Sequence, residues 1–169
     1  MASFLDFCQW LENTPVGSAM RNSGWIAPTI EILHICGIIA LVTSTTILAL
    51  RLLGCTFRTE PVSKLAKRLL PWARFGFILL VATGFLLFSS EATKYYVNLV
   101  FRLKMLMIVL AGLNALIFQW TVYKRVATWD EASTSPLGAR LAACFSILLW
   151  AGAVVAGRLI AYYLPVYYY

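Results

Sequence analysis

The chain has 169 residues, of which 61% are apolar and only 12% are charged. Soluble domains carry about 25% charged residues, so this composition excludes a soluble core of this size and indicates that lipid is the solvent. The net charge is +7, but the basic residues flank apolar segments, as topology signals and anionic-lipid contacts do. We therefore expect no nucleic-acid partner. The four cysteines show no CxxC or zinc-like spacing, which argues against a disulfide framework and a structural zinc site.

The N-terminal segment contains a short amphipathic pattern. Between residues 3 and 14, apolar and aromatic side chains gather on one helical face, and Asp6 and Glu12 lie elsewhere. Pro15 and Gly17 then break the pattern. The two acids also interrupt the first apolar run, so we expect no cleavable signal peptide. The pattern predicts an amphipathic helix in the membrane interface, and a helix packed on the end of the bundle fits equally well.

Four later segments are long and apolar enough to cross a bilayer, which takes about 20 residues. The connection at 55–71 is basic, and its VSKLAKRLL run predicts a surface helix separate from the next span. The sequence thus predicts an all-α fold: an integral membrane four-helix bundle that forms a single transmembrane domain over residues 1–169. The predicted spans are residues 26–53, 72–90, 101–123 and 137–163.

The basic residues are divided unevenly between the two ends of the predicted spans. The positive-inside rule places the richer end in the cytoplasm, so we expect a multi-pass protein of the bacterial inner membrane with both termini in the periplasm. Trp25 and the tyrosines at 167–169 mark the outer rim, where they suit a protein partner or lipid anchoring. The richer end has Arg51, Arg58, Lys64, Lys67, Arg68, Arg74, Lys124, Arg125 and Arg140, and the other has Arg21, Lys94, Arg102, Lys104 and Arg158.

Small residues recur in the predicted spans, as they do where helices pack closely in lipid. Asn114 and Gln119 are polar residues in the third span, and we expect them to hydrogen-bond across the bundle rather than to serve transport. The small residues that we expect at helix contacts are Gly37, Gly76, Gly84, Ala111, Gly112, Ala115, Gly152, Ala153, Ala156 and Gly157.

His34, the only histidine, lies about two turns inside the first span, and Glu31 precedes it on the same helix face. An ionisable residue inside a span is costly and by default marks a functional site or a buried partner. Glu31 could orient the imidazole, as a carboxylate orients a ligand histidine, or the pair could accept protons. The structural alternative is a buried hydrogen bond that only ties helices together.

Three cations from other spans reach the same end of the bundle. Arg102 and Lys104 begin the third span, and Arg158 lies in the last outer turns of the fourth. With Glu31 and His34 they form the predicted cofactor-binding site, in which the cations hold propionates or another anionic group and His34 is the candidate metal ligand. The candidate cofactors are haem b, quinone and copper. The single histidine excludes a haem with two histidines from this chain, and one ExxH is too few for a di-iron site.

Several runs of the sequence resemble an uncharacterised bacterial family of four-helix membrane proteins, a domain of unknown function. These runs are LENTPVGSAMR, PVSKLAKRLLPW, FSSEATKYY, LAGLNALIF and GRLIAYY. The layout is more distantly similar to the copper-resistance D proteins and the HemJ-type protoporphyrinogen oxidases. Those families also place a histidine in the first span and a lysine near the start of a later one, as His34 and Lys104 are placed here. The resemblance to the HemJ-like group implies haem binding by the histidine.

Three hypotheses for the function follow. The first is a small redox-associated subunit, in electron transport, that binds haem, metal or quinone near the periplasmic face through His34. The second is a component of copper or metal transport. The third is a purely structural subunit of a larger complex. All three expect the lipid bilayer and other membrane or periplasmic subunits as partners, and all leave open whether the chain catalyses a reaction.

Overall fold

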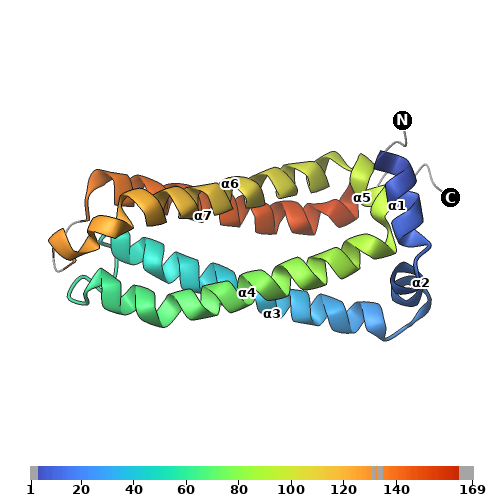
Figure 1. Ribbon diagram of the computed structural model, residues 1–169, viewed down its shortest axis with the longest axis horizontal. Helices are drawn as coiled ribbons and strands as arrows, with labels where there is room; N and C mark the ends of the chain where they lie inside the picture. The colour runs from blue at the N-terminus through green and yellow to red at the C-terminus, as the bar shows by residue number, and fades with distance from the viewer. Residues whose placement is uncertain (1–3, 131, 133–134, 164–169) are drawn as a thin grey trace.

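The computed structural model describes residues 4–130, 132 and 135–163, and this part of the chain is built from helices and their connections (Figure 1). The predicted helix position at residue 3, Glu131 of the last linker and the tyrosines at 167–169 lie outside the described residues. The long helices are α3 (Ile26–Leu52), α4 (Val62–Ser90), α6 (Leu99–Thr121) and α7 (Leu137–Leu159). The short ones are α1 (Phe4–Glu12), α2 (Pro15–Asn22), α5 (Ala92–Val97), η1 (Tyr123–Thr128) and η2 (Ile160–Tyr162).

Four helices in the described part of the chain are long and apolar enough to cross a membrane: α3, α4, α6 and α7 with its extension through η2. Their large apolar side chains face outward, as Leu106, Val109 and Ile117 do on α6. Lipid is the solvent that such a surface requires, because exposed apolar area on this scale is unfavourable in water. The fold is therefore the predicted all-α bundle of a multi-pass membrane protein.

Helix α4 differs from the sequence prediction, because the expected surface helix and the second span form one continuous helix. Pro71 lies inside α4 instead of ahead of it. A proline in a helix removes one backbone donor and crowds the carbonyl of the preceding turn, but Pro71 is exposed, where that carbonyl can find another partner. With 29 residues, α4 is about 43 Å long. It exceeds a hydrocarbon core of about 30 Å, so part of the helix extends beyond the membrane.

The long helices form two layers, α3 with α4 and α6 with α7 (Figure 1). Gly37 and Gly76 allow the backbones of α3 and α4 to meet: a Cβ built on Gly76 would lie 2.8 Å from the Gly37 carbonyl oxygen. Across the other pair, Asn114 of α6 donates from Nδ2 to the Ala142 carbonyl of α7 at 2.9 Å. This bond confirms the role predicted for Asn114. Gln119 is exposed and makes no side-chain hydrogen bond with the described residues.

The two layers are joined firmly at the end that carries η1, the left end in Figure 1. Ala49 and Leu52 of α3 pack there against Ala139 and Ala143 of α7, with Val62 of α4 in the same cluster. These small side chains bring α3 and α7 close together. The contact between these helices is the main direct link between the two layers.

Two side chains complete the η1 end by satisfying backbone groups. Asp130 accepts from the amide of Ser63 at 2.7 Å and from its hydroxyl at 2.5 Å, so a residue from the last linker caps the first turn of α4. Arg51 is fully buried, and its Nε donates to the Glu60 carbonyl at 2.9 Å. Its Nη2 reaches the Ala132 carbonyl at 3.5 Å. The sequence predicts Arg51 to be one of the flanking topology charges, whereas the structure places it in the interior.

The opposite end, which carries α5, is covered by α1 and α2. Cys8 and Leu11 of α1 are buried against Ala92 of α5, and the other face of α1 leaves Phe7 and Trp10 exposed. The helix therefore packs on the end of the bundle with one face and presents aromatic side chains outward with the other. Burial raises the pKa of the Cys8 thiol, and Glu12 adds to the effect. The thiol is therefore uncharged and serves as a small apolar side chain in the packing.

Candidate functional site

His34 lies about 12 Å along α3 from its first residue, and its ring is half-buried against α4. Nδ1 is 2.8 Å from the Thr83 hydroxyl oxygen. That hydroxyl donates its single proton to the Leu79 carbonyl at 2.6 Å, so it must accept from the ring. The hydrogen-bond network thus assigns the proton of the neutral imidazole to Nδ1. Nε2 keeps its lone pair, and it makes no hydrogen bond with the residues that the structure describes.

A glycine makes room for this ring. A Cβ built on Gly84 would lie 3.3 Å from Cε1 of His34, closer than most such contacts. Gly84 follows Thr83 directly, so one short stretch of α4 both accepts the hydrogen bond and supplies the space. The hydrogen bond to Thr83 and the close approach of the ring to Gly84 together restrict the orientation of the imidazole.

Lys104 approaches the same region from the other layer. The side chain is half-buried, and Nζ lies 3.6 Å from the position of a Cβ built on Gly157 of α7. The ammonium is within electrostatic range of His34. It forms no salt bridge within the described part of the chain. The structure therefore places a neutral nitrogen acceptor of α3 beside Gly84 of α4, and a cation of α6 beside Gly157 of α7.

The other three predicted site residues lie at the outer rim. Glu31 is exposed and makes no hydrogen bond to His34, whose partner is Thr83. Glu31 acts on α5 through its charge: burial raises the pKa of the Tyr95 hydroxyl, and the carboxylates of Glu91 and Glu31 act in the same direction. No hydrogen bond therefore joins the predicted pair.

Arg102 and Arg158 are both exposed. The Arg102 guanidinium carbon lies 5.2 Å from the ring centroid of Tyr96, and its Nε donates to the Tyr96 carbonyl at 3.0 Å. This cation–π contact and the hydrogen bond hold Arg102 at the start of α6. Arg158, in the last turn of α7, forms no salt bridge with the described residues. Lys104 is thus the cation that accompanies His34.

Three residues of the site were missed from the sequence: Thr83, Gly84 and Gly157. A threonine inside an apolar helix usually bonds to a carbonyl of the preceding turn, and Thr83 does so. Its second role as an acceptor for His34 depends on the packing of α3 on α4. The sequence predicts Gly84 and Gly157 only as helix contacts. In the structure Gly84 also leaves room for the His34 ring, and Gly157 lies against the Lys104 side chain. The adjacent Thr83 and Gly84 inside an apolar span were the one sequence feature that pointed to a polar contact there.

The side chains that could ligate a metal limit which cofactor could bind at this site. Among the described residues, no three His, Cys, Asp or Glu side chains gather in a group that could hold a metal ion. All four cysteines are free, and Cys36, Cys55 and Cys144 are exposed. A bare copper ion prefers several nitrogen or sulfur donors, which these residues do not supply together. One imidazole nitrogen fits either an organic ligand or a metal that brings its other ligands with it.

The profile of one protein family, described as a family of unknown function (DUF6644), matches residues 7–163. The chain belongs to this family. The match runs from within α1 to the end of η2, so the DUF6644 region contains all four long helices and both His34 and Lys104. No curated protein and no solved structure matches the chain. The predicted membership of a family of unknown function is confirmed, and the distant resemblance to copper-resistance D and HemJ-type proteins stays a prediction.

Proposed function

We propose that this DUF6644 protein is a small redox-associated membrane subunit that binds a quinone or quinol beside His34. The observation that carries the proposal is the bond from Nδ1 of His34 to Thr83, whose own proton goes to Leu79. This arrangement leaves Nε2 as an acceptor inside a membrane span. Lys104 is the nearby donor that completes the pair.

The two side chains suit the two states of one ligand. A quinol carries hydroxyl groups, which Nε2 of His34 can accept from; a quinone carries carbonyl oxygens, to which the Lys104 ammonium can donate. The ligand would supply two-electron chemistry coupled to two protons. An imidazole that holds a proton on Nδ1 and has a free lone pair on Nε2 can accept a proton from the quinol at Nε2. Quinones reach such a site through the lipid, because the surface of the bundle around it is apolar.

Haem b is the second candidate. A histidine whose Nδ1–H is held by an oxygen acceptor has the tautomer and orientation of an axial haem ligand. Lys104 makes haem less favourable, since a cation beside the ligand opposes further positive charge at the bound metal. Copper transport, the predicted alternative, lacks a multi-donor group among the described residues.

Topology and partners belong to the same proposal. Nine basic residues against five favour an inner-membrane orientation with the η1 end in the cytoplasm and both termini in the periplasm. His34 would then lie in the periplasmic third of the membrane. The exposed aromatic residues at the α5 end, such as Trp10 and Trp25, would suit contact with another subunit of a redox complex.

Purification in mild detergent from its native membrane, followed by solvent extraction and chromatography, tests the ligand. We expect about one quinone per chain and a loss of roughly tenfold in His34→Leu and in Lys104→Met, because each removes a hydrogen bond that involves a charged or buried polar group. Gln119→Leu, an exposed polar residue of α6, is the matched control and should retain the quinone. A Soret band without quinone would support haem and refute quinone binding; the absence of both would refute the cofactor proposal.

Thr83→Val tests the role of the tautomer. Valine has nearly the shape of threonine, but it cannot accept from Nδ1–H, so the proton can move to Nε2 and block the acceptor. Loss of the partner that orients a metal-ligating histidine typically lowers metal affinity or activity by about 10- to 100-fold, and we expect quinone affinity to fall by the lower end of this range. Quinone titration into the purified variant measures it. Unchanged affinity in Thr83→Val, with folding intact by circular dichroism, would contradict the assigned tautomer.

A further inference from the structure

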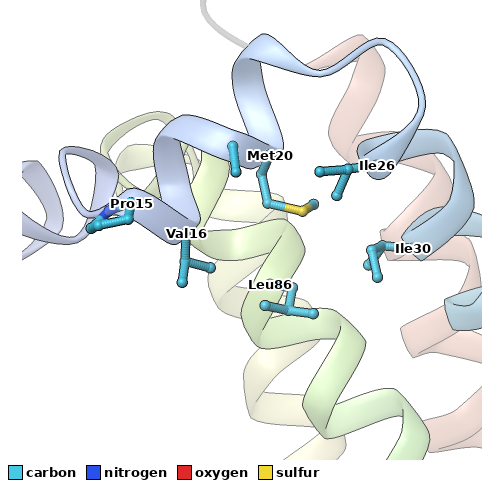
Figure 2. Close-up of a pocket in the computed structure, with 7 residues that line it drawn as sticks. Pro15, Val16, Met20, Ile26, Ile30 and Leu86 are labelled. Carbon is cyan, nitrogen blue, oxygen red and sulfur yellow. The ribbon is translucent and has the colours of Figure 1, made fainter.

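Two cavities, both open to the surroundings, lie beside α2 at the α5 end, and neither belongs to the His34 site. The first has a volume of about 310 Å³ and is lined by apolar side chains from three helices. Figure 2 shows Val16 and Met20 of α2, Ile26 and Ile30 of α3 and Leu86 of α4 around the same space. This size falls in the range of small-molecule sites. Its lining offers nothing to a polar ligand but suits a hydrocarbon chain.

The second cavity has a volume of about 380 Å³ and the opposite character. Two carboxylates, Glu12 and Glu91, and two cations, Arg21 and Lys94, line it together with Ser90 and Thr93. The charges balance. The Thr93 Oγ1 is buried and has no hydrogen-bond partner among the described residues.

The two cavities follow one another along the same helices. Leu86 lines the apolar cavity, and Ser90, one turn nearer the end of α4, lines the polar one. In the same way, Met20 lines the apolar cavity and its neighbour Arg21 lines the polar one. The apolar cavity is therefore the deeper of the two along α4. An amphiphile with its chain in the first cavity and its polar head in the second would have the orientation of a membrane lipid.

The polar cavity offers separate partners for a negative and a positive group. Arg21 donates from Nη1 to the Ser90 carbonyl at 3.1 Å and lies 4.0 Å from Glu12. Within the described part of the chain, its other N–H donors remain available for a phosphate. Glu91 pairs with Lys94 at 2.5 Å. Its carboxylate and the Ser90 carbonyl are acceptors for an ammonium that carries N–H groups.

We propose that these two cavities form one binding site for a zwitterionic phospholipid with a primary ammonium head group, that is, a phosphatidylethanolamine. Arg21 binds the phosphate, Glu91 and the Ser90 carbonyl accept from the ammonium, and one acyl chain enters the apolar cavity beside Met20. A choline head has no N–H to donate to these acceptors. A phosphatidylglycerol head has a negative phosphate but no ammonium that could contact the carboxylates. Its binding would add one net negative charge to a cavity whose own charges balance.

Native mass spectrometry of the detergent-solubilised protein measures the site directly. We expect phosphatidylethanolamine to bind at least about tenfold more tightly than phosphatidylcholine or phosphatidylglycerol of the same chain length, since the wrong head groups leave charged partners unsatisfied. Arg21→Gln should remove most of this preference. Arg125→Gln, an exposed charge in η1 at the other end, is the matched control and should keep it.

Two further measurements separate the parts of the site. Ile30→Phe, which narrows the apolar cavity, should weaken binding several-fold, whereas Ile35→Phe on the exposed face of α3 should not. Soluble phosphoethanolamine should bind much more weakly than the lipid, because it lacks the chain. Equal binding of the three lipids, or unchanged selectivity in a folded Arg21→Gln variant, would overturn the proposal, and so would binding of inorganic phosphate as tight as that of the lipid.

Discussion

Replacing Gly76 with leucine is expected to force α3 and α4 apart and to lower the free energy of unfolding by about 3 kcal/mol or more, the upper range for overpacking in a close-packed interior. A Cβ at this position would lie 2.6 Å from the Leu41 amide nitrogen and 2.8 Å from the Gly37 carbonyl oxygen. Both are backbone atoms, so no side chain can turn aside to make room. Reversible unfolding in mixed micelles, followed by circular dichroism, measures the loss.

The matched control for this prediction is Gly112→Leu in α6. The expectation that Gly112 lies at a helix contact is wrong, because nothing in the described part of the chain lies within 4 Å of a Cβ built on it. Leucine is also a better helix former than glycine. We expect this variant to be as stable as the wild type or slightly more so. If Gly76→Leu and Gly112→Leu were equally stable, the close crossing of α3 on α4 would be incorrect.

Replacing Arg51 with methionine is expected to lower the free energy of unfolding by about 2 kcal/mol, because two carbonyl oxygens lose a partner in a buried setting. Arg51 Nε and Nη2 donate to the carbonyls of Glu60 and Ala132, on two different connections. The side chain thus ties the loop between α3 and α4 to the last linker. We expect limited proteolysis to cut both connections faster in the variant.

Arg58→Met is the control for Arg51. Arg58 is exposed in the same loop, where its Nε donates to the Gly54 carbonyl. Exposed substitutions of this kind usually change stability by no more than about 0.5 kcal/mol. Similar losses in the two variants would mean that removal of positive charge, and not loss of the buried hydrogen bonds, causes the effect.

The two ends of the bundle differ in what they hold. The η1 end contains the packed cluster around Ala49 and Ala139 and the caps made by Arg51 and Asp130. The α5 end contains both cavities, and His34 and Lys104 lie nearer to it. A well-packed end can anchor the helices, which leaves the other end free to carry polar groups and space. Ligand sites in helical membrane proteins require both.

The membrane fold and the position of the single histidine inside a span were accessible from the sequence, and so was the interhelical bond of Asn114. Their signals are local: about 20 apolar residues in succession suffice to cross a bilayer, and a lone imidazole in such a run stands out whatever its neighbours are. The bounds of α3, α6 and α7 agree closely with the predicted spans for the same reason. The continuity of α4 through Pro71 did not follow, since proline more often ends a helix than continues it.

Only the tertiary structure decided which groups meet. Glu31 is three residues from His34 and Thr83 is 49 residues away, yet Thr83 is the hydrogen-bond partner. The sequence determined that the chain is a four-helix membrane protein with an ionisable residue in its first span, because hydropathy is a property of each segment by itself. The partners of that residue, the burial of Arg51 and the two cavities beside α2 depend on how separate helices pack, which no single segment encodes.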